Sequence, residues 1–468
     1  MPLVLGGSSA VAEAYSIDNS CMFNVGDSAY LSKTPAGDGN KKTFTISMWV
    51  KRAALGYVST TVNLLMGADS GSGELSFYHS DVMKFYIDGV YGQTTDALFR
   101  DPTAWYHIVQ AVDTSQSIAA NRIKTYVNGT QITSFSSTND PPLNQDSKFC
   151  SSSYAMTISG SSDSFGGYLA DVCLIDGTQY AASDFGEFDE DSPTSWKPKD
   201  ISGLTFGTNG FLLDFADSAA LGDDVSGNSN DYAVTNLAAT DQMTDTPTNN
   251  YPVLNPLYKN GLVYSEGNLH GTIAASAFES GIGTFGATKG KWYCELKITA
   301  LAGSDIRNSV GIVAAEDCSG SQDMASEELG YSANSIGWQG IGAGSVHKDS
   351  SNVGGSFGPY AIGDVLAIAM DLDNGKWYVA KDNVWENSGD PESGATGTGA
   401  ITIDDITSGF TYMFGNTVYA GSAWDMNFGN PPYANTSDAA DANGYGRFEY
   451  APPSGYYAMN TKNLAEYG

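Results

Sequence analysis

Acidic side chains at positions 187–192, in Glu-Phe-Asp-Glu-Asp-Ser, have types and spacing that could do chemistry. Two carboxyl groups held a few ångströms apart can hydrolyse a glycosidic bond, one as the acid and the other as the nucleophile. This segment runs into Pro193, however, and proline is poorly tolerated within a sheet. We therefore interpret it as a loop and expect no catalysis from Glu187 or Asp189.

Oxygen ligands for a metal ion gather farther along the chain. Ca²⁺ prefers carboxylate and amide oxygens from a loop that contains glycine. The sequence offers such a set at Asp214, Asp217, Asp223, Asp224, Asn228, Asn230 and Asp231. The spacing is not that of an EF-hand, and a chain rich in Asp–Asn turns also produces such clusters by chance. Calcium is thus the one candidate cofactor, since the four histidines lack a metal-ligand spacing such as His-Glu-x-x-His.

Tryptophans near turns are candidates for sugar binding, because sugars stack on exposed rings beside hydrogen-bonding groups. Trp338 is followed by Gln339, and Trp385 lies between Asn383 and Asn387. Either tryptophan could equally be a core residue. His107 shares a strand face with Trp105, which predicts a core or interface histidine with satisfied hydrogen bonds.

The charge of the chain limits its partners. Lys and Arg total 22 against 53 Asp and Glu, a net charge of −31. This charge repels phosphates and anionic lipids, so we expect neither nucleic-acid binding nor membrane insertion. The N-terminus lacks the pattern of a signal peptide and no stretch is long enough to span a membrane, which predicts synthesis in the cytoplasm. The five scattered cysteines are expected to be reduced.

We expect strands to position these residues, because period-two patterns and turn residues, which are typical of strands and hairpins, recur along the chain. In residues 43–50, Phe44, Ile46, Met48 and Val50 alternate with the other side chains. Asn-Gly and Asp-Gly pairs mark hairpins. From 200 to 258 there is no Lys or Arg, and proline recurs. We predict an all-β protein of two tandem antiparallel sandwiches joined by an irregular Asp/Asn/Pro-rich connection.

Four segments resemble the laminin-G and concanavalin-A-like jelly rolls, in the order and spacing of that family. They are Phe44–Val50, Trp105–Val109, Lys124–Ile132 and Tyr168–Val172. The second half looks like a SPRY domain in Gly290–Glu295, Val310–Ile312 and Gly363–Val379. These resemblances imply jelly-roll sandwiches at 21–215 and 261–468, with an N-terminal arm at 1–20 and the connection at 216–260.

The pairing also resembles proteins of tailed phages of marine bacteria, through Asp223–Tyr232, Thr240–Asn250, Asn255–Leu257 and the ending Ala451–Tyr456 with Asn463–Leu464. That likeness implies a non-enzymatic virion protein of a tail fibre, tail tip or capsid surface. The expected partners are other virion proteins, further copies of the chain in a homotrimer, and a host-surface glycan or protein.

The alternative is a polysaccharide depolymerase, because jelly rolls of this type include glycosidases. Their catalytic strand carries Glu-x-Asp-x-Glu or Glu-x-Asp-x-x-Glu. After Glu187 and Asp189 this sequence has Asp191 or Ser192 in the last place, which counts against the alternative.

Overall fold

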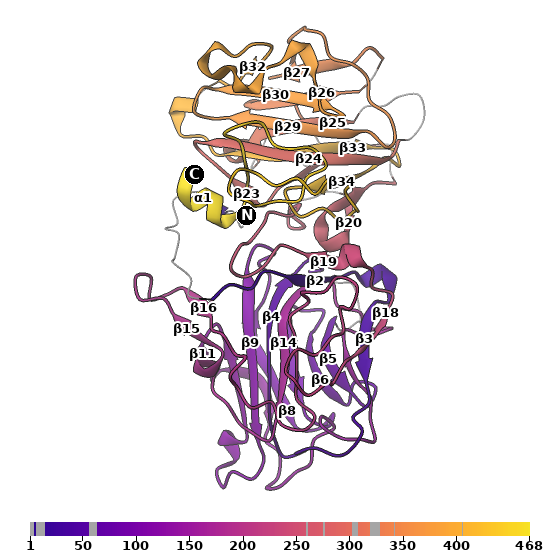
Figure 1. The fold of residues 1–468 in the computed structure, drawn as a ribbon, viewed down its shortest axis with the longest axis vertical. Coiled ribbons are helices and arrows are strands. Elements are labelled where there is room, and N and C mark those ends of the chain that lie inside the picture. Colours follow the sequence, from indigo (N-terminus) through magenta and orange to yellow (C-terminus); the bar gives the residue numbers. More distant parts are fainter. Residues whose placement is uncertain are drawn as a thin grey trace. The chain divides into compact units, whose positions relative to one another are not determined.

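The computed structural model describes residues 4–5, 15–55, 63–258, 261–274, 277–301, 308–318, 328–340, 342–404 and 406–468. The chain forms two compact units, an N-terminal unit of residues 11–248 and a C-terminal unit of residues 249–468 with 1–10 (Figure 1). Strands make up 39% and helices 9% of the structure, which confirms the predicted all-β fold. Most of the predicted arm, residues 1–20, lies outside the described residues.

Two antiparallel sheets form the N-terminal unit. Sheet 1 has the strand order β11 (Thr130–Gln131), β10 (Ile123–Val127), β9 (Trp105–Asp113), β4 (Thr43–Arg52), β14 (Gly167–Asp176), β2 (Ser20–Phe23) and β19 (Gln242–Met243), and β17 (Phe211–Leu213) also pairs with β14. Sheet 2 has the order β12 (Phe135–Asn139), β8 (Gly92–Leu98), β7 (Val82–Tyr86), β6 (Gly73–Phe77), β5 (Asn63–Ala68), β13 (Met156–Ile158), β3 (Tyr30–Lys33) and β18 (Ala233–Thr235).

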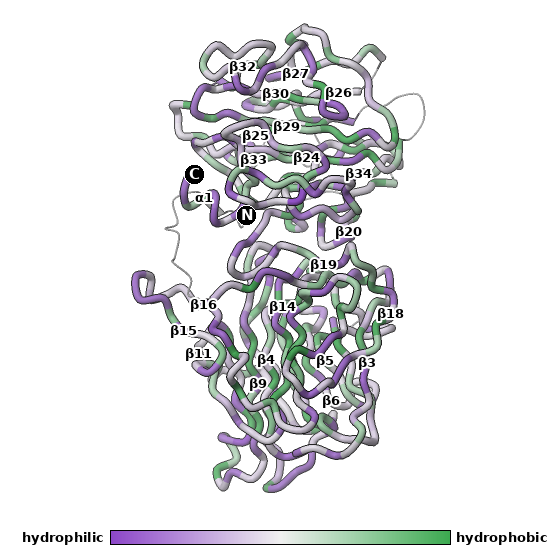
Figure 2. Tube along the Cα trace, viewed as in Figure 1, coloured by the Kyte–Doolittle hydropathy of each residue, from purple (hydrophilic) through white to green (hydrophobic). Residues whose placement is uncertain are grey.

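The core of this unit lies between the two sheets. Phe44, Ile46, Met48 and Val50 of β4 are fully buried in one cluster with Leu75 and other side chains of sheet 2. Figure 2 shows hydrophobic residues gathered mostly on the central strands, where they alternate with hydrophilic ones, and hydrophilic residues mostly in the outer loops and at the sheet edges. The alternation in residues 43–50 thus identified the core face of β4.

Residues 180–206 cover part of the outer face of sheet 1 with a second apolar cluster, which includes Val109, Cys173 and Phe185. The hairpin of β15 (Gly186–Phe188) and β16 (Trp196–Pro198) belongs to this cover. Trp196 donates its indole N–H to His107 Nδ1 at 3.0 Å, and Nε2 of the same ring lies 2.9 Å from Ser47 Oγ. Burial lowers the pKa of His107 to about 3. His107 is therefore a neutral, hydrogen-bonded interior residue, as the sequence predicted.

The structure corrects the predicted connection at 216–260. Residues up to 248 belong to the N-terminal unit. Residues 233–235 form β18 at the edge of sheet 2 beside β3, and residues 242–243 form β19 at the edge of sheet 1 beside β2. The connection is absorbed into the sandwich because both sheets had an unpaired edge there.

The C-terminal unit also contains two sheets. The larger has the order β20 (Val263–Ser265), β21 (His270–Thr272), β34 (Ala423–Asn427), β24 (Lys291–Ala300), β29 (Val365–Asp371), β30 (Lys376–Lys381) and β31 (Val384–Trp385), with β32 (Ile401–Thr402) beside β30 and β35 (Tyr457–Ala458) beside β24. The smaller has the order β22 (Phe278–Ile282), β33 (Tyr412–Tyr419), β25 (Ser309–Ala314), β26 (Ser335–Gln339), β27 (Ser345–Lys348) and β28 (Ser351–Asn352).

Short elements complete this unit. β1 (Val4–Leu5) pairs in parallel with β23 (Phe285–Gly286). Helix α1 (Thr461–Tyr467) begins after Asn460, whose side chain accepts the amide of Asn463. No helix in the described ranges is long and apolar enough to cross a membrane.

The turn at Asn374-Gly375 joins β29 to β30, as its sequence predicts. Gly375 has a φ of 65°, which glycine adopts without strain. Asp371 accepts the amide of Asn374 at 2.9 Å and so caps the turn. Asp373 accepts the amide of Gly290 at 2.8 Å and ties the turn to the start of β24.

A buried ion pair in the N-terminal unit supplies a stability prediction. Lys51 Nζ lies 2.6 Å from Asp245 Oδ2, and both side chains have 0% exposure. The indole of Trp105 donates to the other oxygen of Asp245 at 3.1 Å. Asp245→Ala leaves a buried ammonium without its counter-ion, so we expect this unit to lose about 3–5 kcal/mol of unfolding free energy.

Urea denaturation followed by tryptophan fluorescence measures this loss. The double variant Lys51→Met with Asp245→Leu should recover part of it, because no charge is then left buried. Lys41→Ala, which removes the exposed pair with Asp38, is the control and should change little. An Asp245→Ala transition at the wild-type urea concentration would contradict the prediction.

Asp171 supplies a pH prediction. This carboxyl lies buried in β14, and burial raises its pKa to about 7, although Tyr15 Oη donates a hydrogen bond to it at 3.2 Å. The unfolded pKa is about 3.9, so between these values the folded state holds a proton that the unfolded state has lost. The contribution of Asp171 to stability is therefore full below about pH 4 and is lost as the pH rises through 7.

We expect the unfolding free energy of wild type, relative to that of Asp171→Asn, to fall between pH 5 and 8. Asparagine preserves the shape and tolerates the local φ of 43°. The comparison between variants cancels other titrating groups such as His107. Parallel pH profiles for the two proteins would show that Asp171 is ionised throughout.

Candidate functional site

A row of outward-facing side chains crosses the open face of sheet 2. Ser32, Thr157, Gly67, Glu74 and Tyr86 stand opposite one another on β3, β13, β5, β6 and β7. Residues next to them in these strands, such as Leu31, Met66 and Leu75, are buried in the core. Because side chains alternate between the two faces of a strand, the row points away from the core.

A groove of about 820 Å³ lies over this face. Its floor includes Ser32 and Thr157 from the row, and its walls are the β5–β6 turn and the segments on either side of β13. The lining residues are Tyr30, Ser32, Leu64, Ala68, Asp69, Ser70, Gly71, Glu74, Ser153, Tyr154, Ala155, Thr157, Gly160, Ser161, Ser162 and Asp163. They combine two tyrosine rings with hydroxyl and carboxylate groups.

Gly67 has no side chain, which leaves space at the centre of this sheet face. A Cβ atom there would lie 2.9 Å from Leu64 Cδ2 and 3.2 Å from Thr157 Oγ1. A larger residue would therefore push these two groove-lining side chains apart.

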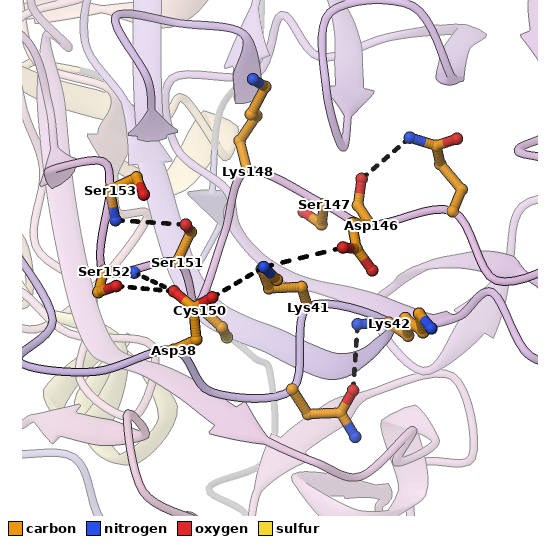
Figure 3. A network of polar contacts seen from close by, with 12 residues as sticks. Asp38, Lys41, Lys42, Asp146, Ser147, Lys148, Cys150, Ser151, Ser152 and Ser153 are labelled. Atoms are coloured by element: carbon orange, nitrogen blue, oxygen red, sulfur yellow. Dashed lines mark hydrogen bonds and ion pairs between the residues drawn. The ribbon is translucent and has the colours of Figure 1, made fainter.

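A second hollow of about 460 Å³ shares Ser153 and Tyr154 with the groove. Its other lining residues are Lys41, Asp88, Gln145, Asp146, Ser147, Lys148 and Ser151. Figure 3 shows this region, where residues 146–153 run beside residues 38–42. The two hollows are thus adjacent and meet at Tyr154.

Lys148 joins the walls of the two hollows. Its ammonium group donates to Tyr154 Oη at 3.0 Å and lies 3.1 Å from Asp69 Oδ2. It also lies 4.4 Å from the centroid of the Tyr154 ring. The hydrogen bonds with Tyr154 and Asp69 raise the pKa of Lys148, which keeps it charged and fixes the tyrosine ring.

Lys41 is held in a similar way. Its ammonium group lies 2.8 Å from Asp38 Oδ2 and 3.8 Å from Asp146 Oδ2. Asp38 also accepts the amide and the hydroxyl of Ser152, both at 2.8 Å (Figure 3). These donors, Lys41 first, hold the pKa of Asp38 well below its usual range. The network fixes the loop that leads to Tyr154.

This arrangement suits carbohydrate recognition. Tyrosine rings supply flat apolar surface, and hydroxyl, amide and carboxylate groups supply the hydrogen bonds that sugar hydroxyls need. The network anchors the loop that carries Tyr154, so this ring is held in place before a ligand arrives.

The predicted platform at Trp338 and Gln339 is wrong. Trp338 has 0% exposure, because it packs against Tyr360 and donates its indole N–H to the carbonyl of Gly358. Gln339 is buried as well and donates to the carboxylate of Glu328. Neither side chain faces solvent.

The second predicted platform is only partly available. Trp385 is half-buried and packs edge-on against Tyr378, with ring centroids 6.4 Å apart. Asn387 is engaged in its own loop, where it accepts the amide of Ser356 and donates to the carbonyl of Gly399. Asn383 is exposed at the preceding turn. Sugar binding at Trp385 stays a prediction.

The predicted calcium ligands form a hydrogen-bonded loop. Asp224 accepts the amides of Leu212, Ser226 and Asn230 and the hydroxyl of Ser226. Asn228 and Asn230 donate to carbonyls of residues 207–210, Asp231 accepts the amide of Asp224, and Asp214 and Asp217 accept local amides. Asp223 is exposed. Within the described ranges no three His, Cys, Asp or Glu side chains gather to hold a metal.

The carboxylates at 187–192 lie outside both hollows. Glu187 is in β15 rather than a loop, because Gly186–Phe188 pairs with Trp196–Pro198. It forms ion pairs with Lys197 and Lys199 at 3.7 and 3.4 Å. Asp189 pairs with Lys197 at 3.1 Å and accepts the amides of Asp191 and Ser192. Both carboxylates serve to hold the hairpin.

The groove was not predicted from the sequence. Outward residues such as Tyr30, Ser32 and Glu74 follow the period-two pattern, but a polar face is usually only solvated. A signal was present in Ser151-Ser-Ser-Tyr154, a run of hydroxyl groups that ends in a tyrosine two residues before β13 begins at Met156.

Asp224 supplies a prediction that separates the two interpretations of its loop. Asp224→Ala removes four hydrogen bonds, so we expect the melting temperature to fall by roughly 5 °C in chelator, without calcium. Asp223→Ala, the exposed neighbour, should leave it unchanged. If Asp224→Ala matches wild type in chelator and differs only with millimolar calcium, the calcium prediction holds and the hydrogen-bond account fails.

Comparison with known proteins agrees with the resemblance of the N-terminal unit. Residues 25–181 match the model of the concanavalin A-like lectin/glucanases superfamily. No curated protein matches the chain. The chain is similar to the solved SPRY domain of human HERC1, with 9% identity, a TM-score of 0.29, and coverage of 37% of this chain and 96% of that one.

Two further solved structures are similar. The PSpry domain of TRIM65 has 9% identity and a TM-score of 0.28, over 37% of this chain and 89% of that one. A proposed carbohydrate-binding protein from Bacteroides ovatus has 14% identity and a TM-score of 0.31, over 48% of this chain and 61% of that one. At these TM-scores the likenesses carry no conclusion about function. What the comparisons establish is a concanavalin A-like domain at residues 25–181.

Proposed function

We propose that this chain is a non-enzymatic recognition protein of a bacteriophage particle, and that it binds host-surface glycan in the groove of sheet 2. The observation that carries the proposal is the groove itself, in which Tyr30 and Tyr154 stand beside hydroxyl groups of Ser32 and Thr157. The match of residues 25–181 to a superfamily of lectins and glucanases supports it.

The candidate catalytic carboxylates of the N-terminal unit are held in ion pairs and hydrogen bonds, which favours binding without hydrolysis. Glycoside hydrolysis needs one carboxyl group free to donate a proton and a second free to attack or activate water. In the groove, Asp69 is paired with Lys148, Glu74 accepts the hydroxyl of Ser76, and Asp163 accepts the hydroxyl of Ser162 at 3.4 Å. Glu187 and Asp189 are paired with lysines in a separate hairpin. The competing proposal is a polysaccharide depolymerase.

A virion location is supported by the phage-like segments around residues 223–257 and 451–464. A tail fibre, tail tip or capsid surface would present several copies of the groove, with a homotrimer as the expected assembly and other virion proteins as further partners. Repeating a weak site on one particle raises avidity about 10²–10⁴-fold without any new contact. A shallow, polar groove is therefore sufficient for attachment.

Glycan arrays and a reducing-sugar assay test the proposal. The purified chain should bind bacterial surface polysaccharide and release no reducing sugar from it. Tyr30→Ala should weaken binding about tenfold, because an aromatic surface is lost from the groove. Tyr331→Ala, which removes an exposed aromatic ring of the C-terminal unit, is the control and should bind as wild type.

Two results would contradict the proposal. Wild type that binds no polysaccharide would remove the recognition function. Sugar release that disappears in Glu187→Gln or Asp189→Asn would establish the depolymerase instead.

A further inference from the structure

We propose that the groove and the second hollow form one continuous track for an uncharged, linear polysaccharide segment, with Tyr154 as the ring shared by both halves. This inference rests on the proposed glycan binding and names the ligand class. Its first support is continuity. Ser153 and Tyr154 line both hollows, and Lys148 of the second hollow contacts Asp69 of the groove.

Size is the second support. The groove has a volume of about 820 Å³ and the second hollow about 460 Å³. Ligand pockets of about 300–1,000 Å³ enclose a drug-sized molecule, so each hollow alone has room for more than one sugar ring. Two adjoining hollows of this size match an extended chain better than a single sugar.

The charges of the lining exclude an acidic polymer. Among the described residues, Asp69, Asp88, Asp146, Asp163 and Glu74 line the two hollows, against the two lysines Lys41 and Lys148. Each lysine is already paired, Lys148 with Asp69 at 3.1 Å and Lys41 with Asp38 at 2.8 Å. A uronic, sialylated or sulfated chain would meet excess negative charge and would have to displace a carboxylate from its lysine.

Most of these carboxylates are also engaged, which leaves little to attract a cationic polymer, and Asp163 accepts the hydroxyl of Ser162 at 3.4 Å. Asp88 accepts the amides of Val90 and Tyr91 and the side-chain amide of Gln145. Asp146 lies 3.8 Å from Lys41 Nζ. What remains along the track is hydroxyl groups, hydrogen-bond acceptors and two tyrosine rings, the partners of a neutral sugar chain.

Asp69→Asn is the sharpest test of the charge argument. Asp69 has a φ of 53°, which asparagine tolerates as well as aspartate does, so the turn should keep its shape. The substitution leaves the Lys148 ammonium without its carboxylate. We expect binding to acidic polysaccharides to appear or rise about tenfold at low ionic strength and to vanish at high salt. Asp163→Asn removes a carboxylate whose partner is the hydroxyl of Ser162 rather than a lysine, so it is the matched control and should gain far less.

Affinity against chain length tests the track. Isothermal titration would compare di- to octasaccharides prepared from whichever neutral polysaccharide the wild-type chain binds on an array of neutral, acidic and basic polymers. We expect affinity to rise about tenfold or more between the shortest and longest members. Tyr154→Ala should remove most of that rise, whereas Tyr154→Phe, which preserves the ring, should retain much of it.

The outcomes distinguish this inference from the function on which it rests. If no polymer binds, the proposed glycan recognition itself fails. If wild type prefers an acidic or basic polymer, or binds a disaccharide as tightly as an octasaccharide, glycan recognition stands and the neutral track is overturned. An Asp69→Asn protein that folds but gains no affinity for acidic polymers also overturns the charge argument.

Discussion

A sandwich buries one face of each sheet against the other, and the pleat of every strand sends the alternate side chains to the opposite face. In the N-terminal unit these two outer faces differ, and the position of the groove depends on that difference. On sheet 1 much of the outer face is buried, with apolar side chains and residues 180–206 over Val109 and Cys173, and with Lys51 and Asp245 paired out of water. On sheet 2 the outer face carries Ser32, Thr157 and Glu74, and there the groove lies.

Because of this difference, the two outer faces suit different purposes. The covered face of sheet 1 contributes to stability, and the open face of sheet 2 is available for contacts. An outer face that is covered cannot meet a ligand, but it can hold His107 between Ser47 and Trp196 and keep it neutral. An outer face that is polar costs little to leave in water, and the loops at its edge can then be shaped for recognition. The ion pairs of Lys148 and Lys41 hold the loop that carries Tyr154 in place at the edge of this face.

Local patterns in the sequence were sufficient for most of the fold. The alternation of Phe44 to Val50 and the turn at Asn374-Gly375 each depend on a few neighbouring residues, and both are found as predicted. The edge strands β18 and β19 were not predictable in this way. Each has only two or three residues, and each forms because a strand about 200 positions earlier offers an open edge.

The groove escaped prediction for a related reason. Asp69 and Lys148 are far apart in the sequence, and each looks like an ordinary surface charge until the sheet brings them within 3.1 Å. For Trp338 the prediction of an exposed ring was wrong, because the large apolar surface that suits tryptophan for stacking suits it equally for a core. Trp338 is buried for that reason, whereas Tyr154, with a hydroxyl group to bond Lys148, stays at the surface.

The small number of Lys and Arg side chains limits the contacts that this surface can make. The chain has 22 Lys and Arg against 53 Asp and Glu, so any lysine that is drawn into a carboxylate pair is lost to ligands. Lys51, Lys148 and Lys197 are all used in this way, as internal ties between segments distant in sequence or across a hairpin. The described surface around the groove is left with acceptors and rings but few available positive charges. Such a surface offers shape and hydrogen-bonding groups rather than free positive charge, and the net charge of −31 repels polyanions.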